Sequence, residues 1–382
     1  MKIGLIVPGG VDRSARVRVI PVLLALIERL ARRHQVVVIA LHQEPEACEY
    51  PLLGAHVINL GLMPARTRFG RYASQLQRVI SVLRSTDSRF DVLHAFWAQG
   101  PGTVAVTVGT LLRIPVVVSI GGGELVWLPE IPYGGQRGRL ARTNLWMALR
   151  MANAVSAGST YALRPLAEVR RDAVWLPLGV DPRIFRGSTR RSFKPPWRLV
   201  HVGSVNEVKD HATLLQAMRL ILEARAQVEL DCFGVEILGD HVQTIARELG
   251  IGRHVRFHGF RPVEDIVPFY RRAHLYVQSS LHESMGAAVL EAAAAGVPTV
   301  GTNVGVVSEM APNAAVAVPV RDPYALAKTI LEVLDHPDRR ECLASSAQNF
   351  AQTYDADWTA SQIEAMYRGV IRNGCSTESS NC

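Results

Sequence analysis

Short apolar runs alternate with longer amphipathic segments along most of the chain. Segments such as 17–33 and 72–84 carry apolar residues at helical spacing. Strands that alternate with helices are typical of parallel sheets built from βα units. The pattern therefore predicts an α/β protein with two Rossmann-like domains. The apolar runs lie at 3–7, 36–41, 92–95, 116–119 and 154–157, and again at 198–203, 228–233, 255–257, 275–278 and 299–301.

Length and local composition indicate where the domains meet. The chain has 382 residues, more than the roughly 250 to 300 at which a single core stops growing. The polar stretch 187–196 ends in two prolines and is typical of a linker. We therefore expect an N-terminal domain at 1–186 and a C-terminal domain at 197–350. Residues 373–382, rich in Ser, Asn and Cys, are expected to form a disordered tail.

Neither targeting signals nor cysteine motifs alter the predicted fold class. The first residues form an apolar strand without the charged head and cleavage site of a secretory signal. No apolar run approaches the 18 or so residues of a membrane span. The five cysteines are scattered and show no C-x-x-C spacing, so neither a disulfide framework nor a zinc site is indicated. We expect a cytoplasmic protein.

Positive charge is concentrated in the first half of the chain. The formal net charge is +8, yet residues 1–186 carry 23 basic and 12 acidic residues, a surplus of 11. Such a surplus attracts nucleic acid, an anionic membrane surface or a phosphorylated substrate, and a solvated surface is the alternative. No nucleic-acid-binding motif is present, so we expect no nucleic-acid partner.

The segment 282–298 carries the most informative chemistry. It places Glu283 in a loop after the apolar run 275–278 and Glu291 eight residues later in a helix. The free N–H groups of a helix start suit a diphosphate, and carboxylates accept hydrogen bonds from sugar or ribose hydroxyls. The structural alternative is that acidic residues near a helix start only offset its dipole.

This segment resembles the E-x7-E motif of the retaining GT-B glycosyltransferases, above all glycosyltransferase family 4. The resemblance implies GT-B architecture: two Rossmann-like domains facing across a deep cleft, with a C-terminal helix at 351–372 returning to the first domain. Further stretches that resemble the family's motifs lie at 8–11, 178–185, 202–210, 255–260 and 354–358.

The resemblance also implies roles for individual residues. Glu283 would hold donor-sugar hydroxyls and Lys209 would neutralise the diphosphate leaving group, so both are candidate catalytic residues. Glu291 would hold the ribose hydroxyls. The alternatives are that Gly9 and Gly10 form an ordinary turn and that Lys209 is a solvated lysine. The other candidate donor-binding residues are Gly9, Gly10, Ser204, Val263, Met285, Gly286, Ala287 and Ala288.

The chain departs from the family at two candidate positions. Ser204 stands where the family usually has an arginine, so leaving-group charge would rest on Lys209 and loop N–H groups. Gly121 stands where many relatives have a histidine near the donor sugar. The resemblance places His94, Gly121 and Glu124 on the acceptor side, and for His94 a core histidine is the alternative.

The resemblance implies anomer-retaining transfer of a hexose-type sugar from a nucleoside-diphosphate sugar to a glycan or lipid-linked acceptor. Cell-surface polysaccharide or glycolipid synthesis would be the setting, with the protein cytoplasmic or peripheral on the inner face of the membrane. No D-x-D pair or histidine cluster is present, so no metal or other cofactor is expected.

Three other functions remain as alternatives. A non-catalytic carbohydrate-binding relative could show the substitutions at Ser204 and Gly121, and an epimerase or hydrolase could share the fold. A nicotinamide oxidoreductase or a P-loop kinase is disfavoured, because neither G-x-G-x-x-G nor G-x-x-x-x-G-K-[ST] is present.

Overall fold

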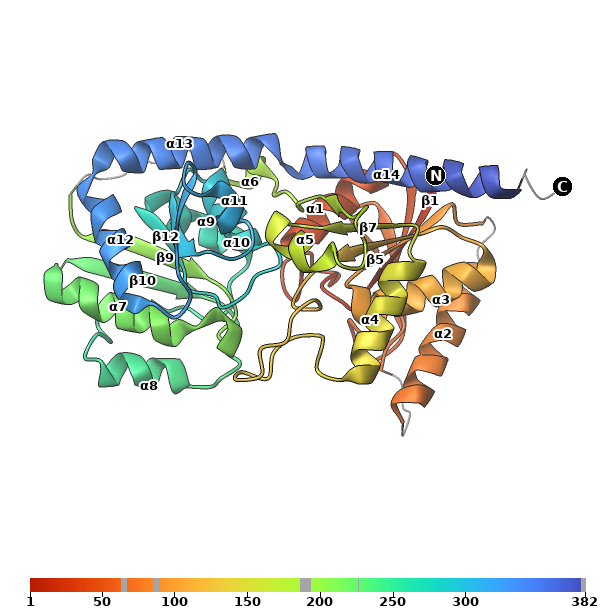
Figure 1. Ribbon diagram of the computed structural model, residues 1–382, viewed down its shortest axis with the longest axis horizontal. Coiled ribbons are helices and arrows are strands. Elements are labelled where there is room, and N and C mark those ends of the chain that lie inside the picture. Colours follow the sequence, from red (N-terminus) through yellow and green to blue (C-terminus); the bar gives the residue numbers. More distant parts are fainter. Residues whose placement is uncertain (63–66, 86–88, 186–193, 226, 379–382) are drawn as a thin grey trace. The chain divides into compact units, whose positions relative to one another are not determined.

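The computed structural model describes residues 1–62, 67–85, 89–185, 194–225 and 227–378. It divides into two compact units (Figure 1). Unit 1 comprises Met1–Leu178 with Ala356–Cys382, and unit 2 comprises Gly179–Asp355. Residues 186–193, which include most of the predicted linker 187–196, lie outside the described residues.

Unit 1 is built on a sheet in the strand order β3-β4-β2-β1-β5-β6-β7-β8. Neighbouring strands are parallel except β3 and β4, which pair antiparallel. The apolar pattern of the sequence did not predict β3, β4 and β8, because these strands are short or have an irregular apolar pattern. The strands are β1 (Lys2–Val7), β2 (Gln35–Ala40), β3 (Cys48–Leu52), β4 (Ala55–Asn59), β5 (Val92–Phe96), β6 (Val116–Ile120), β7 (Ala154–Ala157) and β8 (Val174–Trp175).

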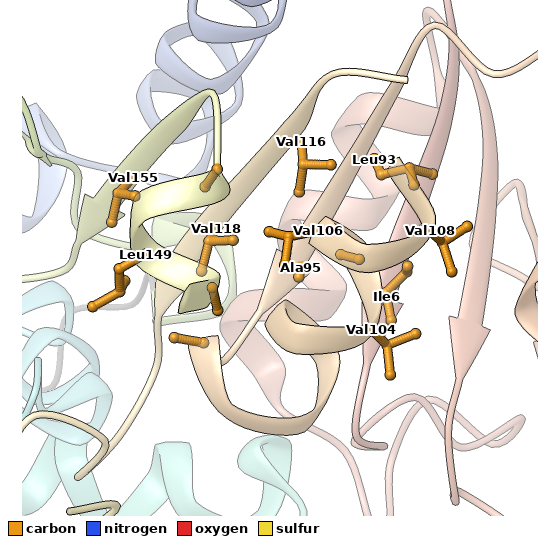
Figure 2. Close-up of a cluster of buried hydrophobic side chains, with 14 of the residues drawn as sticks. Ile6, Leu93, Ala95, Val104, Val106, Val108, Val116, Val118, Leu149 and Val155 are labelled. Carbon is orange, nitrogen blue, oxygen red and sulfur yellow. The ribbon is translucent and has the colours of Figure 1, made fainter. Parts of the chain in front are cut away.

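Helices cover both faces of this sheet. On one face α3 contributes Val104, Val106 and Val108 to an apolar cluster that also contains Leu93, Ala95 and Val116 of the strands (Figure 2). On the other face α1 buries Leu23 and Ile27. Burial on both faces explains why the strands read as continuous apolar runs. The helices of unit 1 are α1 (Pro21–Ala31), α2 (Arg68–Arg84), α3 (Thr103–Leu112), α4 (Arg139–Met151), α5 (Thr160–Leu166) and α14 (Ala356–Glu378), with a π turn η1 (Ala98–Gly102).

The C-terminal helix α14 packs on α1, as predicted (Figure 1). Arg29 of α1, with a side chain only 3% exposed, donates to Asp357 at 2.8 Å. Deeper in the unit the Tyr367 hydroxyl lies 2.7 Å from Nδ1 of His94 on β5. The structure continues this helix to Glu378, past the end predicted at 372, and 379–382 lie outside the described residues.

Unit 2 has a fully parallel sheet in the order β11-β10-β9-β12-β13-β14. Its strands are β9 (Trp197–Val202), β10 (Val228–Phe233), β11 (Val255–Phe257), β12 (Leu275–Gln278), β13 (Thr299–Thr302) and β14 (Ala315–Val318). Its helices are α6 (Pro182–Phe185), α7 (His211–Ala224), α8 (His241–Glu248), α9 (Val263–Arg272), α10 (Ala287–Ala294), α11 (Val307–Met310), α12 (Pro323–Asp335) and α13 (Pro337–Thr353).

The strand order of each sheet reverses at a central pair of strands. In unit 2 the chain runs outward from β9 through β10 to β11, and then from β12 through β13 to β14 on the other side. In unit 1 the same reversal lies between β1 and β5. Open α/β sheets bind ligands outside the carboxyl ends of the strands at such a reversal. Within the described residues no helix is long and apolar enough to cross a membrane.

We expect Tyr367→Phe to lower the free energy of unfolding by about 1–3 kcal/mol, because the buried Nδ1 of His94 loses its partner. Urea unfolding followed by circular dichroism measures the loss. Tyr324→Phe is the matched control, since that tyrosine is 72% exposed. Equal stability of Tyr367→Phe and wild type would show that this hydroxyl does not help to dock α14.

Candidate functional site

The strand reversal of unit 2 brings together two loops, one after β9 and one after β12. Lys209 closes a short 3-10 turn, η2 (Glu207–Lys209), and its N–H donates to the Asn206 side chain at 3.2 Å. The Ser279 hydroxyl, at the end of β12, donates to the carbonyl of Lys209 at 2.8 Å. The backbone of Lys209 is therefore tied to both loops.

Lys209 and Glu283 form an ion pair at this point. The ammonium of Lys209 donates to Oε1 of Glu283, and the Ser280 hydroxyl donates to the same oxygen at 2.7 Å. The two side chains are 21% and 13% exposed. Burial raises the pKa of Glu283, but the charge and hydrogen bonds of Lys209 and Ser280 outweigh burial, so the pKa lies below its ordinary value. Glu283 is therefore held as a carboxylate beside a cation.

The turn between Glu283 and α10 contains one glycine with a positive φ and packs against a second glycine from the loop after β13. Gly286 has φ +96° and immediately precedes α10. Gly305 approaches so closely that a Cβ would lie 2.4 Å from the carbonyl oxygen of Met285. That carbonyl accepts a hydrogen bond from the N–H of Val306 at 2.7 Å. The turn leaves the first N–H groups of α10, at Ala287 and Ala288, without partners within the helix.

Glu291 lies in the same helix and is only 7% exposed. The Tyr270 hydroxyl donates to its Oε2 at 3.0 Å. Burial raises the pKa of Glu291 to about 7, and the hydrogen bond from Tyr270 opposes that rise only in part. Tyr270 was not among the candidates from the sequence, because its contact with Glu291 arises from packing between α9 and α10.

The remaining candidates of unit 2 lie at the same edge of the sheet. Ser204 follows β9, where the neighbouring Gly234 comes so close that a Cβ would lie 2.9 Å from the N–H nitrogen of Ser204. Val263 is the first residue of α9, in the connection that follows β11. The structure thus places every candidate of unit 2 except Glu291, which lies within α10, in a connection after a strand or at the start of the next helix, but it assigns no ligand contact to Ser204 or Val263.

In unit 1 Gly9 and Gly10 lie in a turn after β1 that hydrogen bonds hold in place. Gly10 has φ +81°, and its carbonyl accepts from the N–H of Ile20 at 2.9 Å. The N–H of Val11 donates to the side chain of Gln43 at 3.0 Å. A Cβ at Gly9 would lie 3.2 Å from the same side-chain oxygen. The two glycines therefore let this loop pack tightly on its neighbours.

Glu124 ties together the loops after β5 and β6. Its buried carboxylate accepts hydrogen bonds from the N–H groups of Ala98, Gly121 and Gly122, at 3.1, 3.2 and 2.5 Å. Burial raises its pKa despite these bonds. A Cβ at Gly121 would lie 2.7 Å from the indole of Trp97, so that ring occupies the space a side chain there would need. Trp97, which has φ +73°, was also missed by the sequence analysis.

His94 lies in the interior of unit 1. It is 0% exposed, and its ring nitrogens lie 2.7 Å from the hydroxyls of Tyr367 and Ser119. Burial lowers its pKa to about 3, so the imidazole is neutral. These contacts agree with the alternative of a core histidine, and the acceptor-side role of His94 stays a prediction.

Sequence comparison assigns the two halves to matching families. Residues 188–350 match the family "Glycosyl transferases group 1", and residues 19–179 match "Glycosyl transferase 4-like domain". The chain belongs to the retaining GT-B glycosyltransferases of family 4. The parallel sheet in each unit and the contact of α14 with α1 agree with GT-B architecture.

Solved structures share this family fold at low sequence identity. Sucrose-phosphate synthase from Thermosynechococcus elongatus has a TM-score of 0.81 and 18% identity, covering 98% of this chain and 100% of that one. HepE from Anabaena, in complex with UDP and glucose, has a TM-score of 0.75 and 19% identity, covering 96% and 99%. These likenesses show the family fold alone.

Curated family relatives match over shorter lengths. The D-inositol 3-phosphate glycosyltransferase of Corynebacterium urealyticum is 32% identical over 178 residues, which is 44% of this chain and 42% of the relative. D-inositol 3-phosphate glycosyltransferase 1 of Catenulispora acidiphila is 26% identical over 314 residues, 75% and 73% of the two chains. The chain spans less than half the length of the first curated relatives it matches.

We expect Glu291→Gln to gain stability relative to wild type as pH rises. A folded-state pKa of about 7, above the unfolded value of 4.5, gives wild type a contribution that is present below pH 4.5 and lost as pH rises through 7. Glutamine keeps an acceptor for Tyr270 and has no charge to bury. The difference in unfolding free energy should therefore grow by roughly 3 kcal/mol between pH 4.5 and 8.

Thermal and urea unfolding across that pH range measure the difference. Glu341→Gln is the control, since Glu341 is exposed on α13. A stability difference for Glu291→Gln that stays constant with pH would contradict the raised pKa.

Proposed function

We propose that this protein transfers a hexose-type sugar, with retention of anomeric configuration, from a nucleoside-diphosphate sugar to a hydroxyl of a glycan or lipid-linked acceptor. The observation that carries the proposal is the Lys209–Glu283 pair at the strand reversal, directly before the N-terminus of α10. A cation and free N–H groups suit a diphosphate, and a carboxylate beside them suits sugar hydroxyls. Structures of similar fold hold UDP and UDP-glucose, which supports this donor class.

In the proposed reaction the bond between the anomeric carbon and the donor phosphate oxygen breaks, and the electron pair leaves with the diphosphate. Lys209 and the N–H groups of Ala287 and Ala288 stabilise that developing charge. The acceptor hydroxyl attacks the anomeric carbon from the face that the diphosphate leaves, and its proton passes to the diphosphate. Glu283 holds the donor sugar through its hydroxyls. Because Ser204 supplies no cation, the proposal gives Lys209 the larger share of the charge.

Metal independence is part of this proposal. Among the residues that the structure describes, no group of three or more His, Cys, Asp and Glu is placed to hold a metal ion. Lys209 would supply the positive charge instead. The roles of Gly9, Gly10, Val263, Gly121 and Glu124 in donor or acceptor binding remain predictions.

A phosphorylated polyol is a second candidate acceptor. The curated relatives are named for a phosphorylated inositol. In unit 1 the loop after β1 exposes Arg13, Arg16 and Arg18, and the last of these pairs with Asp12 and Glu44. The positive surplus of residues 1–186 suits a phosphorylated acceptor, and it equally suits an anionic membrane that presents a lipid-linked one.

We expect Lys209→Met and Glu283→Ala to separate the two parts of the donor. Lys209→Met should weaken binding of both a nucleoside diphosphate and its sugar conjugate, because the phosphate loses its cation. Glu283→Ala should weaken binding of the sugar conjugate alone. Each variant should lower kcat/KM by about 10²- to 10³-fold. Thermal stability against UDP, GDP, ADP and CDP sugars and the free diphosphates measures binding, with about 2.7 kcal/mol of stabilisation at a hundredfold excess over Kd.

Lys328→Met is the control, since its side chain is 79% exposed on α12. If none of these nucleotides stabilised the wild type, the proposed donor site would be wrong. NMR of the product separates the alternatives: a new glycosidic bond with the donor's anomeric configuration supports transfer, whereas free sugar or an epimer supports a hydrolase or an epimerase.

A further inference from the structure

Tyr270 is buried where three elements of unit 2 meet. It lies on α9 and is 0% exposed. Phe185 of α6 packs edge-on against its ring, with centroids 6.1 Å apart, and Tyr276 of β12 lies at 6.3 Å. The ring therefore has neighbours on α6 and β12 that restrict its rotamers. The position of its hydroxyl is correspondingly well defined.

That hydroxyl makes its strongest contact with Glu291. The O–H donates to Oε2 at 3.0 Å, whereas the carbonyl of Ala288 is at 3.5 Å. Among the residues that the structure describes, none donates a hydrogen bond to Oε1 of Glu291. One carboxylate oxygen is thus held by the protein and the other is left to accept from a ligand.

We propose that Tyr270 is a positioning residue that fixes the Glu291 carboxylate so that its second oxygen receives the ribose hydroxyls of a nucleotide. The inference rests on the proposed function, because it takes Glu291 as the ribose contact. Glutamate has three rotatable side-chain bonds, and a side chain already held in one rotamer loses less entropy when the ligand binds. Tyr270 itself touches neither sugar nor phosphate in this arrangement.

The contact between Tyr270 and Glu291 should affect how nucleotide binding depends on pH, because it changes the pKa of Glu291. Burial raises the pKa of Glu291 to about 7, and the Tyr270 hydroxyl favours the charged form. Tyr270 from α9 and Tyr276 from β12 are the titratable groups that face this carboxylate. Loss of the Tyr270 hydroxyl should therefore shift the ionisation of Glu291 to higher pH. The charged groups on α13 and α6, which also pack against α10, are Asp338, Arg339, Arg340, Glu341 and Arg183.

The test is calorimetric binding of UDP, GDP and ADP to the full chain between pH 5.5 and 9. For wild type we expect Kd to rise up to tenfold per pH unit below about 7, because the ionised carboxylate binds the ribose. Tyr270→Phe should bind several-fold more weakly at pH 9, where the carboxylate is ionised in both proteins and only its positioning is lost, and the deficit should grow as the pH falls through 7 because Glu291 of the variant ionises at higher pH. A role in packing alone would weaken binding by the same factor at every pH, and that result would overturn the inference.

Two further variants keep the result interpretable. Tyr276→Phe removes a hydroxyl that donates to the carbonyl of Val202 at 3.1 Å, so its pH profile should match wild type. Glu291→Gln should bind weakly and keep only the shallow pH dependence that titration of the terminal phosphate gives every variant, which tests the carboxylate even if Tyr270→Phe fails to fold. A pH dependence in Glu291→Gln as steep as that of wild type would overturn the inference. Failure of wild type to bind any of the three nucleotides would overturn the proposed function itself, and this inference with it.

Discussion

Burial of both faces of a parallel sheet constrains everything else in this protein. The strands of each unit are mostly apolar, so many of the polar groups with chemistry to perform collect where strands end. The strand order of unit 2 reverses between β9 and β12, and Lys209 and Glu283 come from the loops that follow those two strands. Their ion pair therefore follows from topology as much as from the residues themselves.

The two glutamates of one motif experience opposite electrostatic surroundings. Glu283 has an ammonium beside it, and its pKa falls. Glu291 has only the neutral Tyr270 hydroxyl, and its pKa rises. Both side chains are largely buried, so the charge of the partner decides the difference. One short segment thus presents a fixed carboxylate and a second one whose charge changes near neutral pH.

The sequence predicted features that repeat or follow a motif. Alternating apolar runs indicated two parallel sheets, and the spacing of Glu283 and Glu291 located the loop and helix of the candidate site. Tyr270 could not be found in this way, because its contact with Glu291 arises from packing between α9 and α10. The same holds for Trp97 beside Gly121. For His94 the sequence left a core position as one alternative, but it could not show that the hydrogen-bond partner is a tyrosine 273 residues later.

The return of α14 to unit 1 has a consequence for synthesis of the chain. Unit 1 is assembled from both ends of the sequence, so the ribosome completes all of unit 2 before Tyr367 and Ile363 emerge. Until then the apolar face of α1 and the imidazole of His94 lack their native cover. A nascent chain passes through a long interval with this surface exposed, which is where chaperones act and where truncated chains would aggregate.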